Sequence, residues 1–292
     1  MDGYENMEAK KKKTGIIDVG GGMRDVFAAG VLDGFLEKGI SFDYGIGISA
    51  GSGNLTSFFA GQYGRNLKFY VDYAFRKDYI SVQNFLKTGN YVNLEYAHST
   101  LAGSFGEAPL DYKAFERNIG EYYVVACNAR TGETKYFEKK DISLDCYDVI
   151  KASSTLPVVN KPYVISGVPY YDGGLADPVP VAKAFADGCD KVVLILSRPA
   201  DYVRTSKKDS RFAKLIQKKY PKAARELCRR AEKYNRSVAL AKEYEKEGKL
   251  LLLAPTDCFG VDTLTRNREN IRRLYAAGVE AAGNVPEEFW IR

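Results

Sequence analysis

The sequence predicts an α/β fold of three layers, in which helices cover both faces of a central, mostly parallel sheet and a helical C-terminal extension follows. Two observations carry this prediction. Short apolar runs alternate with helical patterns from Thr14 onward, and residues 191–196 are apolar almost throughout. Alternating strands and helices build parallel sheets, and a strand buried on both faces reads as a continuous apolar run.

Two strand–helix units are expected at the start of the fold. A strand at 14–19 precedes a glycine-rich loop and a helix at 26–38, whose apolar residues recur on one face and which Gly39 ends. A second strand at 42–48 leads directly into a helix at about 49–62. Successive units of this kind place their strands in parallel.

The later elements are predicted from the same patterns, together with turn residues and prolines. Expected strands lie at 122–127, 134–137, 163–165, 168–171, 191–196 and 249–254. Expected helices lie at 149–155, 179–186, 262–282 and, with an interruption near Pro221, across 209–247. The aromatic-rich stretch from Phe69 to Phe105 has little periodicity, and core packing is its first interpretation.

Composition and charge narrow the class of protein. Of 292 residues, 45% are hydrophobic and 27% charged, as in an ordinary globular protein. The segment 201–249 holds sixteen Lys and Arg against seven Asp and Glu, so it carries +9 and the remainder of the chain −3. A solvated helix face and contact with anionic lipid are its two interpretations. No nucleic-acid-binding motif accompanies the charge, so we expect no nucleic-acid partner.

The five cysteines are odd in number and form no C-x-x-C pair, which argues against a disulfide framework and a zinc site. We therefore expect a reducing cytoplasm as the location. The longest apolar run, at 250–254, is too short to span a bilayer, so any membrane contact is expected to be peripheral.

A G-x-S-x-G motif, Gly47-Ile48-Ser49-Ala50-Gly51, lies between an expected strand and an expected helix. A sharp turn there exposes the serine hydroxyl at the carboxyl edge of the sheet, and the glycines avoid collisions with the turn. Capping of the following helix by Ser49 is the alternative interpretation. If Ser49 is a nucleophile, a carboxylate is its expected base, because the single histidine, His98, precedes the acid considered next.

Two further glycine motifs accompany the serine. The turn Asp172-Gly173-Gly174 follows an expected strand, and a carboxylate within reach of a hydroxyl can take its proton during attack. The loop Gly20-Gly21-Gly22-Met23-Arg24 follows the first strand, where a glycine run lets several amides turn towards one oxygen. Capping of a turn by Asp172 and phosphate binding by the glycine loop are the alternatives.

These motifs resemble those of the patatin-like phospholipases, which carry a GGGxR loop, a GxSxG turn and a DGG turn on an α/β sheet. The resemblance covers residues 14–200, and Ala152-Ser153-Ser154-Thr155-Leu156-Pro157 is similar to a segment that precedes the family's aspartate. It implies a Ser49–Asp172 catalytic dyad. On this basis we expect a basic tail at 1–13, a catalytic domain at 14–200, and a mostly helical region at 201–292 packed on the same domain.

The resemblance also assigns roles to the glycine loop. The amides of Gly20, Gly21, Gly22 and Met23 are expected to form the oxyanion hole, and Arg24 is expected to bind a phosphate headgroup. The chain departs from the family at the next position, where Asp25 replaces a glycine. Asp25 is expected either to add negative charge to the rim of the pocket or to cap the following helix, and His98 is expected on the surface or in a loop.

The expected function is that of a lipid acyl hydrolase, a phospholipase or carboxylic ester hydrolase that works through an acyl-serine without a metal or organic cofactor. The segment from Phe69 to Phe105 then has a second interpretation, as a cover that binds acyl chains. Two other classes stay open. One is a catalytically weak or inactive lipid-binding or regulatory protein of the same fold, and the other is a nucleotide-binding α/β protein that uses the glycine loop.

Overall fold

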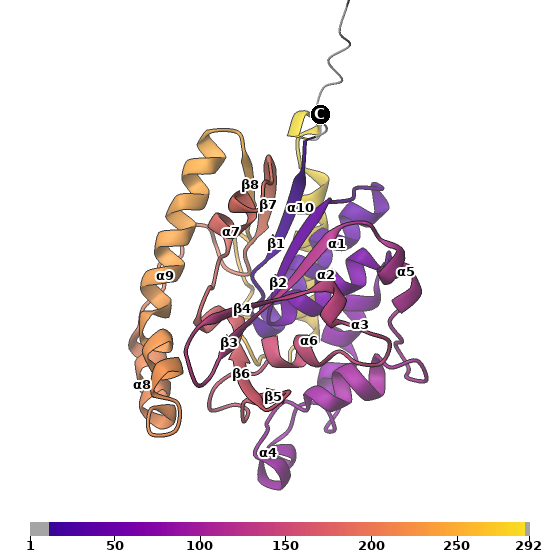
Figure 1. Ribbon diagram of the computed structural model, residues 1–292. Helices are drawn as coiled ribbons and strands as arrows, with labels where there is room; N and C mark the ends of the chain where they lie inside the picture. The colour runs from indigo at the N-terminus through magenta and orange to yellow at the C-terminus, as the bar shows by residue number, and fades with distance from the viewer. Residues whose placement is uncertain (1–11, 290–292) are drawn as a thin grey trace, which may run out of the picture.

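An 8-stranded sheet forms the centre of the computed structural model, which describes residues 12–289 (Figure 1). Its strand order is β5-β6-β3-β2-β1-β7-β8, with β4 paired to β3 outside this path. The strands are β1 (Thr14–Asp18), β2 (Tyr44–Ile48), β3 (Glu121–Asn128), β4 (Thr134–Glu138), β5 (Tyr163–Ile165), β6 (Val168–Asp172), β7 (Lys191–Ile195) and β8 (Leu250–Leu253). The five strands from β3 to β8 along this order are parallel, whereas β4, β5 and β6 pair antiparallel.

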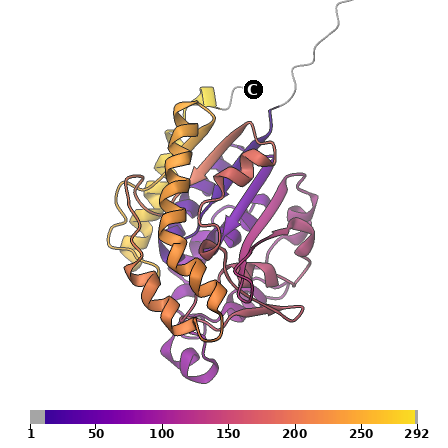
Figure 2. The same ribbon diagram turned by 60° about the vertical axis from the view of Figure 1, so that its left-hand side comes forward.

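Helices cover both faces of this sheet. They are α1 (Val26–Glu37), α2 (Ala50–Phe59), α3 (Arg65–Val71), α4 (Val82–Thr88), α5 (Tyr112–Arg117), α6 (Asp148–Ser153), α7 (Val181–Ala186), α8 (Lys207–Ile216), α9 (Pro221–Lys246) and α10 (Arg268–Gly283). Figure 2 shows α9 running along one face. The three-layer α/β architecture and its mostly parallel sheet are therefore confirmed.

Neighbouring residues of β1 show how the two faces are filled. Ile16 packs in a buried cluster with α1 and α10, whereas Ile17 packs in a second cluster with Tyr234 and Val238 of α9. Successive side chains of a strand point to opposite faces, so a strand buried on both faces must be apolar at every position. This is why the short strands read as continuous apolar runs.

The C-terminal region contributes to the same core. Strand β8 extends the sheet by pairing with β7, and α10 lies against α1. The two helices approach closely through glycines: a Cβ on Gly30 would lie 2.1 Å from the Tyr275 carbonyl oxygen, and a Cβ on Gly278 would lie 2.1 Å from that of Phe27. Residues 1–11 of the expected basic tail lie outside the described residues.

Two segments have secondary structure that the sequence patterns did not predict. The stretch from Phe69 to Phe105 folds as short helices, among them α4 and a π-helical turn at Tyr96–Leu101. Helix α10 begins at Arg268 and not near residue 262, because the Asn267 side chain caps it by accepting the Asn270 amide at 3.1 Å. Short helices with few repeats leave no periodic signal to detect.

The α1–α10 contact predicts an unusual response to alanine. Gly278→Ala should lower the free energy of unfolding, because overpacking costs about 1–3 kcal/mol and helix propensity returns at most about 1 kcal/mol. Gly283→Ala is the matched control, because a Cβ there meets nothing within 4 Å. Urea denaturation measures both variants. Equal stability of the two would contradict the close approach.

Candidate active site

The turn between β2 and α2 holds Ser49 in a strained conformation. Its φ of 56° and ψ of −130° lie outside the regions that side-chain-bearing residues ordinarily adopt. A Cβ on Gly47 would lie 2.5 Å from the Ser52 Cα, and one on Gly51 would lie 2.5 Å from the Asp18 carbonyl oxygen. Ser49 occupies the N-cap position of α2, but its side chain makes no capping hydrogen bond. Its hydroxyl is therefore not used to cap the helix.

A neighbouring helix end holds both Ser49 and Asp172 by their backbones. The Ser49 amide donates to Oγ of the buried Ser153 at 2.8 Å, and the Asp172 amide donates to the Thr155 carbonyl at 2.8 Å. Asp172 ends β6, which pairs with β3. Residues 153–155 at the end of α6 thus bridge Ser49 and Asp172. No local sequence signal indicates this role.

The carboxylate of Asp172 is buried, with 1% of its surface exposed. Its Oδ1 caps the following turn by accepting the Gly174 amide at 2.8 Å, as the alternative interpretation predicts. Oδ2 has no partner with full hydrogen-bond geometry among the described residues, yet the Ser49 hydroxyl is close enough to lower the pKa of Asp172 as a hydrogen-bond donor. The two side chains therefore lie together, loosely aligned, and such pairs often tighten only when substrate binds.

Charge around Asp172 comes from α9. Burial raises the pKa of this carboxyl above its usual range, and the positive charge of Arg230 is the largest influence that pulls the pKa back down. Arg230 is close to the DGG turn, since a Cβ on Gly174 would lie 2.9 Å from its Nη2. Nothing in the sequence distinguishes Arg230, because it lies 58 residues beyond the acid in a basic helix with many similar residues.

The glycine loop lies against Ser49. A Cβ on Gly20 would lie 2.9 Å from the Ser49 Cβ, and one on Gly21 would lie 2.2 Å from Oγ of Ser197. The Ser197 hydroxyl also donates to the Gly20 carbonyl at 2.6 Å. The loop is therefore fixed from both sides.

The amides of this loop are not equally available. The Gly20 amide donates to Oδ1 of Asp18 at 3.0 Å, and the Met23 amide donates to the Thr263 carbonyl at 3.0 Å. Within the described chain, the amides of Gly21–Gly22 donate to no other residue. Of the four amides expected to form the oxyanion hole, those of Gly21 and Gly22 are therefore the two without an acceptor among the described residues.

Arg24 does not line the cavity beside Ser49. Its side chain is 7% exposed and forms an ion pair with Asp262, and its Nη1 donates to Oγ1 of Thr263 at 3.0 Å. Burial is the main cause of a lowered pKa for this guanidinium. Arg24 is therefore engaged with Asp262 and Thr263 in this structure, and its expected role in binding a headgroup stays a prediction.

Asp25 occupies the N-cap position of α1, as one interpretation expects, but its side chain neither caps the helix nor reaches the rim of the cavity. The residue is completely buried and absent from the cavity wall, and its side chain makes no capping hydrogen bond to α1. Its Oδ2 instead accepts from Nδ2 of Asn54 at 2.9 Å, and the same Nδ2 donates to Oδ2 of Asp18 at 3.2 Å. Gly51 of the Ser49 turn packs on Asp18, and Asn54 joins Asp18 to Asp25. Asp25 therefore lies beneath this turn.

The Asp18–Asp25 pair behaves as one acid group. Burial raises the pKa of both carboxyls, and the charge of Asp18 raises that of Asp25 further. Oδ1 of Asp25 is buried with no donor among the described residues, which fits a protonated oxygen that donates to Asp18. Two buried carboxyls in contact hold one proton more easily than two negative charges.

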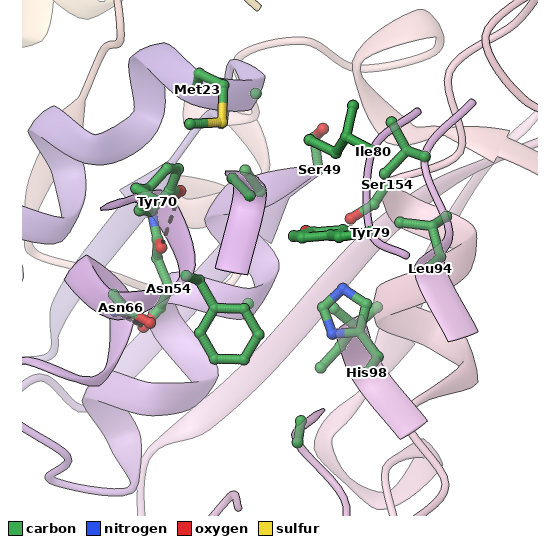
Figure 3. Close-up of a pocket in the computed structure, with 18 of the residues that line it drawn as sticks. Met23, Ser49, Asn54, Asn66, Tyr70, Tyr79, Ile80, Leu94, His98 and Ser154 are labelled. Carbon is green, nitrogen blue, oxygen red and sulfur yellow. Dashed lines mark hydrogen bonds between the residues drawn. The ribbon is translucent and has the colours of Figure 1, made fainter. Parts of the chain in front are cut away.

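A cavity of about 130 Å³ opens beside Ser49 (Figure 3). Its wall is mostly apolar and comes largely from the segment 65–110, including Phe69, Tyr79 and Leu94. His98, expected on the surface or in a loop, is half-buried on the π-helical turn Tyr96–Leu101 and also lines this cavity. Burial first, and then nearby positive charges, lower the pKa of His98 to about 3, which leaves the imidazole neutral.

The sequence model of the patatin-like phospholipases matches residues 19–185, more than half of the chain. The chain belongs to the patatin-like phospholipase family. A second family model, a domain of unknown function (DUF6363), matches residues 220–289 of this patatin-like protein. That match covers α9, β8 and α10.

Two known proteins are similar to this patatin-like chain. One is "Uncharacterized protein YjjU" of Escherichia coli K12, 31% identical over 191 residues, which are 64% of this chain and 52% of that protein. The chain thus spans about half the length of this relative. The structure of VipD from Legionella pneumophila matches 93% of this chain and 66% of that chain, with 12% identity and a TM-score of 0.47. Across residues 12–289, no helix is both long and apolar enough to cross a bilayer.

The Asp18–Asp25 pair predicts a pH-dependent stability. Because burial raises both pKa values, that of Asp18 to about 6, wild-type stability should fall as pH rises above 4 and through 6. Asp25→Asn removes one titrating acid and can still donate to Asp18, so relative to wild type it should gain about 1–3 kcal/mol between pH 5 and pH 8. Urea denaturation at pH 5 and at pH 8 measures the free energy of unfolding of each variant. Asp201→Asn is the control, because Asp201 is exposed. A wild-type pH dependence in Asp25→Asn would refute the shared proton.

Proposed function

We propose that this protein is a lipid acyl hydrolase that cleaves carboxylic esters of phospholipids or related lipids through an acyl-Ser49 intermediate. The observation that carries the proposal is the position of Ser49, on a strained turn at the wall of an apolar cavity and beside the buried carboxylate of Asp172. Membership of the patatin-like phospholipase family supports lipid hydrolase activity in general.

In the proposed mechanism, Asp172 takes the Ser49 proton as the serine oxygen attacks the ester carbonyl. The carbonyl oxygen becomes negative and accepts hydrogen bonds from the Gly21–Gly22 amides, whose donors have no other described partner. Collapse of the intermediate transfers the proton from Asp172 to the leaving alcohol and leaves the acyl group on Ser49. Water, deprotonated by the same carboxylate, then attacks the acyl carbon; the bond to Oγ breaks, Asp172 returns the proton to Ser49, and the acid leaves.

The electrostatics of Asp172 support its role as the base. Burial raises its pKa and makes the carboxylate a better proton acceptor, while the positive charge of Arg230 lowers the pKa and favours the ionised form. His98 is on the cavity wall but no hydrogen bond joins it to Ser49 in the described chain, so a direct Ser–Asp pair is favoured over a histidine relay.

The cavity supports an acyl chain as the group that binds there. Its wall is mostly apolar, as expected for a hydrocarbon ligand. The volume of about 130 Å³ compares with a cavity of about 150 Å³ that holds benzene. A short acyl group fits as the structure stands, and a long chain requires the segment 65–110 to move.

A catalytically weak lipid-binding protein of the same fold is the second candidate. The observation that favours it is the loss of two of the four expected oxyanion donors, since the Gly20 and Met23 amides already have partners. We also propose that the protein acts in the cytoplasm with peripheral contact at anionic membranes. Five free cysteines and the basic helices α8 and α9 support this location.

Two substitutions test the dyad. Ser49→Ala should abolish labelling by a fluorophosphonate and hydrolysis of nitrophenyl butyrate, and Asp172→Asn should lower kcat by about 10²–10⁴, the usual contribution of a general base. Asp177→Asn is the matched control, because this nearby acid accepts a hydrogen bond from Tyr136 that the amide retains. Wild-type turnover in Asp172→Asn would refute the dyad.

Arg230 gives the dyad a testable pH dependence. The base must be ionised, so kcat/KM falls as pH drops through the pKa of Asp172, which burial has raised above 3.8. Arg230 lowers that pKa, so Arg230→Met should raise it and move the acidic limb to higher pH. The exposed neighbour Arg229→Met is the control. An unmoved limb in folded Arg230→Met would show that Asp172 is not the titrating base.

A further inference from the structure

Helix α4 presents an unpartnered apolar surface to solvent. None of its residues is buried, and Val82, Phe85 and Leu86 are 63%, 45% and 79% exposed. Figure 1 shows the helix projecting from the lower end of the molecule. Large apolar side chains gathered on a projecting helix mark an interaction site, since scattered exposed residues do not cluster in this way.

The stem of this helix is part of the cavity wall. Tyr79 and Ile80 precede α4 and Val92 follows it, and all three line the cavity that contains Ser49. An isolated bridge between Ile80 and Val92 closes the stem. One continuous segment therefore carries the exposed apolar tip and the inner wall of the proposed acyl site.

Positive charge surrounds the tip. Lys77 precedes α4 and Lys87 lies in its last turn, both are exposed, and the segment 76–91 has one acid, Asp78. Lys161 approaches the end of the helix and donates from Nζ to the Thr88 carbonyl at 2.7 Å. The local charge is thus net positive.

The turn between α8 and α9 adds to this charge at the same end of the molecule. Figures 1 and 2 both show this turn at the lower end, together with α4. Lys218 and Lys219 of the turn and Lys222 at the start of α9 are exposed, as is Leu215 of α8, with 68% of its surface free. The end of the molecule therefore combines exposed apolar side chains with a basic surround.

We propose that α4 and the α8–α9 turn form a docking surface for an anionic lipid interface. Phe85 and Leu86 enter the boundary between headgroups and acyl chains, the lysines bind the headgroups, and the stem delivers an acyl chain to the cavity. This inference rests on the proposed function, because it assigns the membrane from which the hydrolase takes its substrate.

A second copy of the chain fits this surface less well. A stable dimer buries about 800 Å² on each partner, and the apolar part of α4 consists of three side chains on a helix of 7 residues. The basic surround would also meet an identical basic surround in a symmetric contact. An anionic lipid surface avoids both difficulties.

Vesicle binding tests the proposal independently of catalysis. Ser49→Ala protein is sedimented with vesicles of phosphatidylcholine alone or with about one third phosphatidylglycerol, and it should bind the anionic vesicles preferentially. Adding Phe85→Ser and Leu86→Asp should weaken that binding about tenfold or more, as loss of buried apolar area requires. Ile119→Asp is the matched control, because Ile119 is 94% exposed and precedes the amino end of β3, whereas Ser49 follows the carboxyl end of the parallel strand β2. Lys218→Glu with Lys219→Glu should also weaken binding.

Each contrary outcome identifies what fails. Absent vesicle binding, or equal binding by the α4 variant and the Ile119 control, overturns the docking surface. A dimer in sedimentation analysis that the α4 variant converts to a monomer assigns the surface to a second copy and also overturns the proposal. Hydrolysis of nitrophenyl butyrate by the wild-type protein, which retains Ser49, distinguishes failure of the hydrolase proposal from failure of the docking surface. If the wild-type protein does not hydrolyse this ester, the proposed hydrolase function is refuted. If it hydrolyses the ester but vesicle binding does not depend on α4, only the docking surface is refuted.

Discussion

The turn between β2 and α2 has no room for a side chain on either side of Ser49, and the arrangement of the site depends on that crowding. Gly47 approaches the first turn of α2, and Gly51 approaches Asp18 at the end of β1. The serine is thereby held in a conformation that costs about 1–3 kcal/mol. Because its backbone is fixed, the hydrogen bond from its amide to Ser153 also fixes the end of α6, and through Thr155 that end fixes Asp172. The serine and the acid are thus positioned by shared backbone contacts.

The buried acids around this turn differ in what compensates the cost of burying their charge. Asp172 has a cation, Arg230, whose charge counters the effect of burial on its pKa and favours the carboxylate form that the proposed base requires. Within the described chain, Asp18 and Asp25 have no cation in hydrogen-bond contact. Their partners are each other, the Asn54 side chain and, for Asp18, the Gly20 amide, and burial raises the pKa of both carboxyls, which favours a shared proton. The first arrangement, a carboxylate beside a cation, suits the proton transfer proposed for Asp172. The second provides a neutral hydrogen-bonded support beneath the turn.

The sequence predicted the fold class, the strands and the long helices, because apolar periodicity and turn residues are local signals. It also pointed to Ser49, Asp172 and the glycine loop, each of which follows a predicted strand. It could not predict the partner of Arg24, since Asp262 lies 238 residues away and nothing local marks the pair. The burial of Asp25, the effect of Arg230 and the place of His98 in the cavity wall likewise depend on which elements the fold brings together. The departure at Asp25 looked like a change in the pocket, but the tertiary structure places it beneath the turn.

The central claim is that Ser49 attacks and that Asp172 and the Gly21–Gly22 amides assist it directly. An experimental structure of the protein after reaction with a fluorophosphonate tests this most directly. The account predicts phosphorus bonded to Oγ of Ser49, the phosphonyl oxygen facing the two glycine amides, and the Asp172 carboxylate beside Oγ. Phosphorus on another residue, or a phosphonyl oxygen turned away from the glycine loop, would contradict it.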